Sequence, residues 1–386
     1  MPWKVDTVSD VRRDFVEMAS GEGSKMSELC ERFGVSRKTG YKWLKRFRSA
    51  GVEGLSDRSR RPVSSPGQTH SELEARIIEL RQEHPAWGAR KLRRWLSDRG
   101  VSSLPVASTI MEILKRNDLV RGDHPSLAGP YQRFERERPN ELWQMDFKGH
   151  FAMGNGRRCH PLTVLDDHSR FSILLQACDN ERGETVQRAL TGVFRLYGLP
   201  EGMLMDNGSP WGDDRESPWT PLTVWLLRLG VRVSHGRPYH PQTQGKIERF
   251  HRTLKAEVLQ GVPLRHLEES QARFDPWREI YNYERPHEAL GMSTPGRRYE
   301  PSGRSYPEQL PEQEFSPIDQ VRRVQSKGEF SFRGQKWRVS KAFVGQRVGL
   351  RPTLVEGVWQ VWFGRTCLGE MNRAQVGESR RVVRRR

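Results

Sequence analysis

The amino-acid sequence predicts a multidomain α+β protein with two N-terminal helix-turn-helix units, a mixed α/β core and a small C-terminal β-domain. Three observations predict this organisation. Apolar residues recur at helical spacing through residues 10–116, short strand-like runs alternate with helical segments after residue 141, and glycine-separated alternating runs follow residue 320. Strands followed by alternating helices and strands are typical of a mixed sheet that is covered by helices.

The size and charge of the chain indicate its class of partner. Its 386 residues, 35% of them hydrophobic, are enough for two or three domains with cores of their own. The formal net charge is +17 and the pI is about 10.1. Such an excess favours a polyanion as partner, because each neutralised phosphate releases condensed counterions. No apolar run approaches a membrane span and the N-terminus lacks an apolar signal core, so we expect a soluble, unexported protein.

The four cysteines, Cys30, Cys159, Cys178 and Cys367, are scattered along the chain. They form no CxxC motif and no Cys/His cluster with the spacing of zinc ligands. We therefore expect inert thiols in the core.

The first helical unit has the spacing of a helix-turn-helix. A short helix is expected at 10–20, and residues 26–48 predict a helix, a tight turn at Gly34 and a second helix capped by Ser36. The alternative is an ordinary three-helix packing unit with a solvated basic face. DNA binding is favoured because the basic run continues beyond the second helix. The residues expected to contact DNA are Arg37, Lys38, Thr39, Lys42, Lys45, Arg46, Arg60 and Arg61.

A second helical unit follows a linker rich in Ser, Pro and Gly. Three short amphipathic helices are predicted at 71–83, 88–98 and 108–116. Two tandem units on a basic chain predict recognition of a long, bipartite DNA site. The second unit could also serve only as a spacer.

The core is predicted from alternating strands and helices. Strands are expected at 141–151, 160–171, 171–178, 201–208 and 231–234, with helices at 182–197 and 219–230. Residues 236–260 predict a turn-rich basic loop that runs into an amphipathic helix, and a further helix is expected at 265–290.

The helix after the basic loop carries one acid among cations. Its apolar residues, Ile247, Phe250, Leu254 and Val258, fall in one stripe that should pack on the core. Glu248, Arg252 and Lys255 lie on a different, polar face. Glu257 lies half a turn away from Glu248, so the two acids cannot face one site. The alternative is a solvated helix in which Glu248 and Arg252 form an i,i+4 pair.

Two acids at strands complete a candidate site. Asp146 lies inside a strand and Asp206 ends another, and burying either is expensive unless a cation or hydrogen bonds compensate it. With Glu248, these carboxylates are suited to two hard divalent cations and hence to phosphoryl transfer. Spacing alone leaves four competing acids open, which are Asp166, Asp167, Asp213 and Asp214.

Four segments carry a family resemblance. WQMDF at 143–147, LDDHSR at 165–170, MDNGSP at 205–210 and RPYHPQTQGKIERFHRTLK at 237–255 resemble the core of the retroviral-integrase-type DDE transposases of bacterial insertion sequences. The resemblance covers about residues 130–295, and the N-terminal helical units are similar to those of such transposases.

The resemblance implies an RNase H-like core in which Asp146, Asp206 and Glu248 occupy the catalytic Asp, Asp and Glu positions. It also implies two Mg²⁺ ions, with Mn²⁺ as a substitute. One departure is the spacing of 41 residues between Asp206 and Glu248, which is longer than is common in the family. The loop at 211–219 is the natural place for the extra residues, because loops absorb insertions at little cost. Lys246, Arg249, Arg252 and Lys255 are expected to hold phosphates beside the metals, the alternative being simple solvation.

The C-terminal part alternates apolar and polar residues between glycines, which suggests a small five-strand barrel. It resembles the SH3-like domain of integrase-type proteins. A basic tail of sequence RRVVRRR follows and is expected to lie on DNA or to be disordered.

The expected domain boundaries follow from these segments. They are a helix-turn-helix domain at 1–55, a linker at 56–70, a second helical domain at 71–120, a connector at 121–139, the catalytic core at 140–295, a linker at 296–319, the small barrel at 320–375 and the basic tail at 376–386.

The function expected is that of a DNA transposase. It would bind the terminal inverted repeats of an insertion sequence, cleave at the element ends and join their 3′ hydroxyls to target DNA. The expected partners are double-stranded DNA and a second copy of the chain, as a homodimer or higher in a synaptic complex, with no membrane. The expected location is the bacterial cytoplasm, at the nucleoid when bound to DNA. Two alternatives stay open, a transposase-derived repressor without catalysis and an RNase H-like nuclease that cuts without joining.

Overall fold

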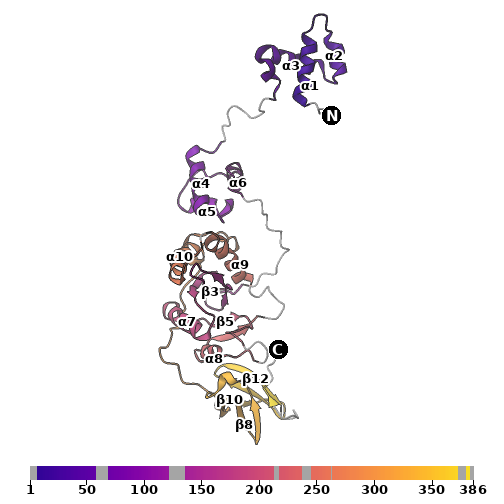
Figure 1. The fold of residues 1–386 in the computed structure, drawn as a ribbon. Coiled ribbons are helices and arrows are strands. Elements are labelled where there is room, and N and C mark those ends of the chain that lie inside the picture. The colour runs from indigo at the N-terminus through magenta and orange to yellow at the C-terminus, as the bar shows by residue number, and fades with distance from the viewer. Residues whose placement is uncertain are drawn as a thin grey trace. The chain divides into compact units, whose positions relative to one another are not determined.

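The structure is a computed structural model of the chain, and it describes residues 7–57, 68–120, 135–212, 217–236, 245–261, 263–372 and 380–382. The chain divides into two compact units, Met1–Gln68 and Thr69–Arg386. Figure 1 shows the helices and strands of each unit. None of the helices in the described ranges combines the length and the apolar composition that crossing a lipid bilayer requires.

The first unit is the predicted helix-turn-helix. It comprises α1 (Val8–Ser20), α2 (Met26–Arg32), α3 (Arg37–Ala50) and the 3-10 helix η1 (Gly51–Leu55). The Ser36 hydroxyl accepts from the Thr39 N–H at 3.2 Å, which confirms the predicted cap. The turn contains Gly34 at a φ of 63°. A Cβ on Gly40 would lie 2.7 Å from Cys30 Sγ, so only glycine lets α2 and α3 pack this closely.

The second compact unit, Thr69–Arg386, begins with three helices that match the ranges predicted for the second helical domain. They are α4 (Ser71–Glu83), α5 (Ala89–Asp98) and α6 (Ala107–Arg116). Their apolar stripes enclose Trp87, Leu92 and Ile110, all fully buried. Arg99, the residue after α5, forms an ion pair with Glu284 at 2.7 Å, so this helical bundle contacts the core that follows it.

The core contains a mixed sheet, as predicted. Its strands are β1 (Trp143–Phe147), β2 (Phe151–Ala152), β3 (Arg158–Asp166), β4 (Ser172–Cys178), β5 (Gly202–Met205) and β6 (Arg232–His235). The order is β2-β3-β1-β5-β6, with β4 also paired to β3. β1 and β4 run antiparallel to β3, whereas β5 runs parallel to β1 and β6 parallel to β5.

Helices cover both faces of this sheet. One face packs Trp143 and Met145 of β1 against α7 (Gly183–Tyr197) and α8 (Pro221–Arg228). The other face packs Leu165 and Leu175 against α9 (Gly245–Leu254), the π-helix η3 (Lys255–Leu259) and α10 (Leu267–Glu279). The chain continues through η4 (Ile280–Glu284), η5 (Glu288–Leu290) and η6 (Pro295–Arg297).

The C-terminal β-domain differs from the predicted five-strand barrel. Its elements are β7 (Gln320–Arg323), β8 (Glu329–Phe332), β9 (Gln335–Arg338), η7 (Lys341–Phe343), β10 (Arg347–Pro352), β11 (Val358–Phe363), β12 (Thr366–Asn372) and β13 (Arg380–Arg381). They form two sheets, ordered β12-β11-β10-β7 and β13-β9-β8. The strand pairing of the described residues does not close a single barrel, so that prediction is not confirmed.

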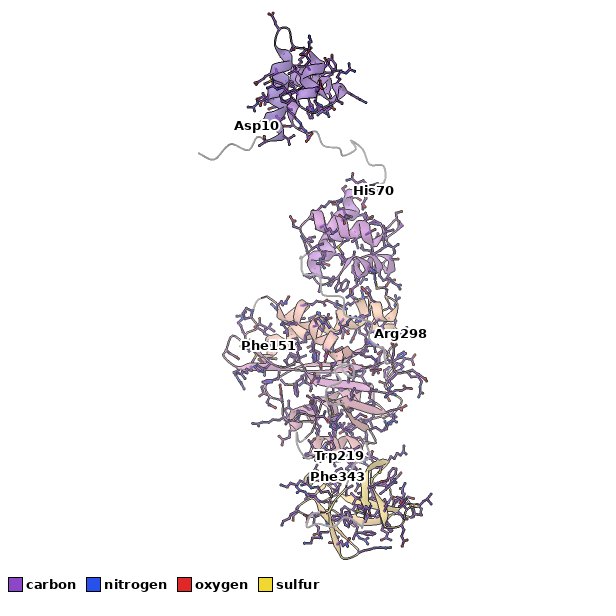
Figure 2. All side chains as sticks on the ribbon, turned by 90° about the vertical axis from the view of Figure 1, so that its right-hand side faces the viewer. Asp10, His70, Phe151, Trp219, Arg298 and Phe343 are labelled. Atoms are coloured by element: carbon purple, nitrogen blue, oxygen red, sulfur yellow. The ribbon has the colours of Figure 1, made fainter. Side chains whose placement is uncertain are left out.

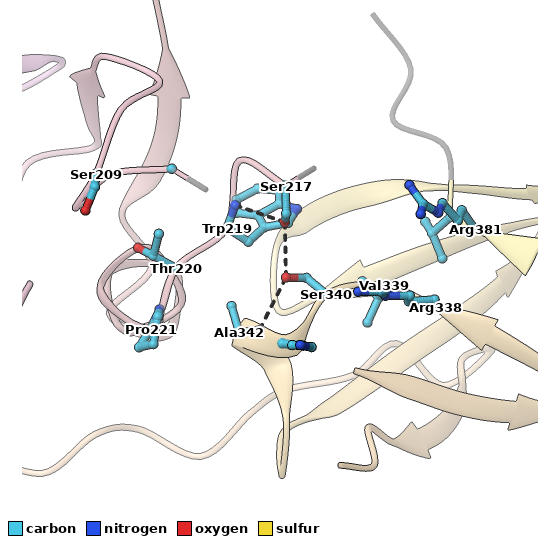
Figure 3. A pocket seen from close by; sticks show the side chains of 13 residues that line it. Ser209, Ser217, Trp219, Thr220, Pro221, Arg338, Val339, Ser340, Ala342 and Arg381 are labelled. Carbon is cyan, nitrogen blue, oxygen red and sulfur yellow. Dashed lines mark hydrogen bonds between the residues drawn. The ribbon is translucent and has the colours of Figure 1, made fainter. Parts of the chain in front are cut away.

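The loop before α8 contacts the C-terminal domain. Trp219 and Phe343, labelled in Figure 2, meet edge to face with ring centroids 5.8 Å apart. The Ser217 hydroxyl donates to the Ser340 hydroxyl at 3.1 Å, as Figure 3 shows. A cavity of about 520 Å³ lies at this junction, lined by Thr220 of the core and by residues of the C-terminal domain. The long spacing between Asp206 and Glu248 therefore includes residues that bind the C-terminal domain to the core.

The cysteines follow the prediction with one exception. Cys30, Cys159 and Cys178 are buried, and burial raises the pKa of Cys159 to about 11 and of Cys178 to about 12. Cys367 is exposed, so the expectation of a core thiol is wrong there. Its strand β12 alternates faces, and Cys367 falls on the outer face beside the buried Leu368.

Candidate active site

Asp146 lies on the face of the sheet that α9 covers. Strand side chains alternate between faces, and Trp143, Met145 and Phe147 of β1 are buried in the core on the α7 side. Asp146 therefore points to the opposite face. There it pairs in register with Thr163 on β3. Its side chain is 23% exposed.

Asp206 lies at the same edge of the sheet as Asp146. It follows Met205, the last residue of β5, and β5 runs parallel to β1 as its direct neighbour. The carboxyl ends of neighbouring parallel strands meet at one edge, which is where sites in α/β sheets form. One Asp206 oxygen accepts from the Gly208 N–H at 3.1 Å.

Glu248 lies in the first turn of α9 with an exposed side chain. The predicted apolar stripe is confirmed, since Ile247, Phe250 and Leu254 are at most 2% exposed and Val258 is 7% exposed. Packing of this stripe fixes the rotation of α9 and leaves the polar face with Glu248 open to solvent.

The surroundings of Asp146 raise the pKa of its carboxyl group. Burial raises the pKa of Asp146 to about 7, and the negative charges of Asp206, Glu181 and Glu248 add to the rise. A hydrogen bond from the Phe147 N–H opposes it.

The three acidic side chains provide the type of ligand atom that hard divalent cations bind. Asp146, Asp206 and Glu248 offer only carboxylate oxygens, which are the ligand atoms that such cations prefer. In the described ranges, no three His, Cys, Asp or Glu side chains are already drawn together in a cluster able to hold an ion.

Thr163 and His251 connect the strand of Asp146 to the helix of Glu248. The Thr163 hydroxyl donates to the Asp146 carbonyl at 2.8 Å and lies 2.7 Å from His251 Nε2. Burial lowers the pKa of His251 to about 3, with the Lys148 charge assisting, so this imidazole is neutral. His251 Nδ1 lies 3.9 Å from an Asp146 oxygen, and with a neutral ring that approach is not an ion pair.

Neither Thr163 nor His251 is among the site residues predicted from the sequence. A signal was present in each segment. Thr163 is the polar residue in the apolar run PLTVL, and His251 follows Glu248 by three residues, which is close to one helical turn. What the sequence does not reveal is that the two side chains meet.

The competing acids bind other groups. Asp166 accepts from the Ser169 N–H and hydroxyl and from the Asn140 N–H, although burial raises its pKa. It closes the turn between β3 and β4. Asp167 pairs with Lys246 at 2.6 Å. The other two competitors, Asp213 and Asp214, lie outside the described residues.

The four predicted cations on the α9 segment differ in their surroundings. The Lys246 ammonium is bound to Asp167, and burial lowers its pKa to about 8, with the Arg170 charge adding to the effect. Arg249, Arg252 and Lys255 are exposed. The loop at 237–244 lies outside the described residues.

The predicted DNA-contact residues of the first unit lie mostly on the outer face of α3. Arg37, Lys38, Lys42 and Lys45 are exposed. Two further residues are held within the unit, because Arg46 stacks over Trp43 at 4.9 Å and the Thr39 hydroxyl lies 3.0 Å from that of Ser36. Arg60 and Arg61 lie outside the described residues.

Models of known protein families match the N-terminal helical regions, the core and the C-terminal domain of this chain. An integrase core domain matches residues 136–241, and a second integrase core model matches 229–295. The C-terminal domain of IS481 family transposases matches 319–378. A helix-turn-helix domain matches 11–62 and a homeodomain-like domain matches 39–114.

Two curated relatives come from insertion elements. The chain is 27% identical over 278 residues to an uncharacterized protein of insertion element IS407 from Burkholderia multivorans, covering 70% of this chain and 92% of the relative. It is 26% identical to an uncharacterized protein of insertion element IS476 from Xanthomonas euvesicatoria, covering 71% and 78%. Among solved structures, a simian T-cell lymphotropic virus intasome in complex with a PP2A regulatory subunit aligns at 16% identity and a TM-score of 0.36, covering 75% of this chain and 97% of that one.

Proposed function

We propose that this chain, which carries an integrase core domain and is related to the transposases of insertion sequences, cleaves DNA at the ends of its element and joins the 3′ hydroxyls to target DNA. Asp146, Asp206 and Glu248 are the residues that carry the reaction. Its substrate is double-stranded DNA, bound first at the terminal inverted repeats.

One observation supports this proposal above the others. Asp146 and Asp206 come from neighbouring parallel strands at one edge, and α9 brings Glu248 to the face on which Asp146 lies. The rise in the pKa of Asp146 to about 7, caused first by burial and next by the negative charge of Asp206, supports the proposal. The competing acids Asp166 and Asp167 bind Ser169, Asn140 and Lys246.

The three carboxylates would hold two Mg²⁺ ions, or Mn²⁺ in their place. The chemistry that such ions supply when bound is activation of the attacking oxygen and stabilisation of the leaving oxygen in an in-line displacement. Asp146, whose pKa is raised to about 7, would hold the metal in its deprotonated form. No side chain becomes covalently attached to DNA in this scheme, because the attacking group is water or a 3′ hydroxyl.

The basic surfaces hold the DNA. Arg249, Arg252 and Lys255 lie on the exposed face of the helix that carries Glu248, where they can bind phosphates beside the reacting bond. The exposed cations of α3 bind phosphates of the terminal repeat, with the N-terminal part of that helix in the major groove. Synapsis brings two element ends together, so at least a dimer is the active form.

The test is a strand-transfer assay with labelled element ends, Mg²⁺ and the full-length chain. Glu248→Gln should bind the ends as the wild type does and lose joining by at least a hundredfold. Joining at the wild-type rate by this variant would overturn the assignment of Glu248.

The products separate the proposed function from its alternatives. Joined products support a transposase. Cut but unjoined ends indicate a nuclease, and sequence-specific binding without any metal-dependent cleavage indicates a DNA-binding repressor. Either of these two outcomes would overturn the proposal.

A further inference from the structure

We propose that Thr163 and His251 are positioning residues that hold the helix of Glu248 against the strand of Asp146, so that the acids can bind divalent cations together. This inference rests on the proposed function, because it assumes that Asp146 and Glu248 are metal ligands. Neither residue touches the cations or the DNA in this scheme.

The hydrogen bonds define the direction of the connection. A threonine hydroxyl has one hydrogen, and Thr163 gives it to the Asp146 carbonyl at 2.8 Å. The second contact, 2.7 Å to His251 Nε2, must therefore be donated by the imidazole. The two hydrogen bonds run from His251 through Thr163 to the backbone of Asp146, and they join α9, β3 and β1.

Burial makes this connection rigid. Thr163 is fully buried and His251 is 7% exposed, so water does not compete for either group. Losing one partner would leave a buried polar atom unsatisfied, at a cost in free energy. Such a cost keeps both side chains in place.

The location of the two residues connects them to the acids. His251 follows Glu248 by three residues, so fixing its ring limits how α9 can turn or slide near Glu248. Thr163 is the register partner of Asp146 and binds its carbonyl, so it limits movement of Asp146. Apolar packing of Phe250 and Leu254 sets the distance of α9 from the sheet but is not directional, whereas the hydrogen bonds are.

Groups that support metal ligands indirectly are known to change metal affinity by about 10–100-fold when they are removed. A merely structural pair would lower stability without changing metal affinity. The two possibilities are therefore distinguished by measuring metal binding separately from folding.

The experiment measures Mn²⁺ binding to the full-length chain by electron paramagnetic resonance, with no DNA present. Thr163→Val keeps the shape of the side chain and removes the hydroxyl, whereas Thr163→Ser keeps the hydroxyl. We expect Thr163→Val to weaken Mn²⁺ binding by about tenfold or more and Thr163→Ser to restore it to within about threefold of wild type.

The same comparison is made at His251. His251→Gln keeps an N–H donor near the position of Nε2, and His251→Leu removes it. His251→Leu should weaken Mn²⁺ binding as Thr163→Val does, and His251→Gln should restore most of it. If Thr163→Val does not fold at the assay temperature, this second pair decides the matter.

A matched control is Thr223→Val. Thr223 is also fully buried, and its hydroxyl caps α8, which packs on the other face of the sheet. This variant should lose stability and keep the Mn²⁺ affinity of wild type. Equal Mn²⁺ affinity in Thr163→Val and wild type would overturn the inference.

Failure of the proposed function is recognised separately. If wild type binds no Mn²⁺, or if Asp146→Asn binds it as well as wild type does, the metal site itself is wrong. If Asp146→Asn loses Mn²⁺ while Thr163→Val and His251→Leu retain it, only the positioning inference fails.

Discussion

Glu257 and Arg285 form an ion pair at 3.2 Å in which the two side chains are only 7% and 9% exposed. Glu257 also accepts from the Trp277 indole N–H at 2.8 Å. Glu257 therefore joins η3, which continues α9, to α10 and to the segment that follows it. These contacts give Glu257 a structural role, although it lies only nine residues from Glu248.

The first prediction compares these two glutamates by the same substitution. Glu257→Gln leaves Arg285 buried without a counter-charge and should lower the free energy of unfolding by about 3–5 kcal/mol. Glu248→Gln, at an exposed position, should change it by less than about 0.5 kcal/mol. Urea denaturation at neutral pH measures both. Equal stability of the two variants would contradict the structural role of Glu257.

The second prediction concerns pH and His287, which is 8% exposed. Burial, with the nearby charges of Arg285 and Lys91, holds the pKa of His287 well below its ordinary value of 6.5. Below pH 6.5 the unfolded chain then binds a proton that the folded chain does not, so stability falls with falling pH and is constant above 6.5. Between pH 7.5 and 5.5 this residue should cost about 1.4 kcal/mol.

His287→Asn removes that cost, because an amide takes up no proton. The stability difference between wild type and this variant should therefore shift by about 1.4 kcal/mol between the two pH values, as measured by urea denaturation. His150→Asn, at an exposed position, is the control and should show no such shift. A constant difference for His287→Asn would mean that the imidazole takes up its proton over the same pH range in the folded and the unfolded chain, which would contradict the prediction.

The third prediction concerns the junction of core and C-terminal domain. Trp219 is 5% exposed and Phe343 is fully buried, so each single change to alanine should cost about 3–5 kcal/mol of unfolding free energy. A double-mutant cycle should also give a coupling of about 0.5–1.5 kcal/mol from the edge-to-face contact. Leu354→Ala, at a fully exposed position, is the control. Strict additivity would indicate that the two rings do not meet in solution.

The fourth prediction concerns DNA binding by α3. Lys38 is exposed on this helix, and Lys38→Ala should reduce the salt dependence of binding to the element ends by about one unit of slope. The measurement is fluorescence anisotropy across a series of KCl concentrations. Lys25→Ala is the matched control, because that ammonium already pairs with Glu28 at 3.0 Å, and its slope should change by less than half as much. An unchanged slope for Lys38→Ala would remove α3 from the DNA interface.

The candidate site was predictable in part. Asp146, Asp206 and Glu248 stand out in sequence because an acid within or at the end of an apolar strand, or among cations on a helix, is unusual. Asp166 and Asp167 satisfy the same local criteria. Only the folded chain separates them, since their partners Ser169, Asn140 and Lys246 are known only from spatial contacts.

The sequence by itself determined the six helices of the two N-terminal helical regions, the cap at Ser36 and the buried stripe of α9, because side-chain periodicity and capping act over a few neighbouring residues. The tertiary structure decided which polar groups meet. The contact of Thr163 with His251, the pairing of Lys246 with Asp167 and the division of the C-terminal domain into two sheets all depend on residues far apart in the chain. Such contacts are chosen by how whole faces pack and by which buried polar groups find partners, and neither property is written in any short stretch of sequence.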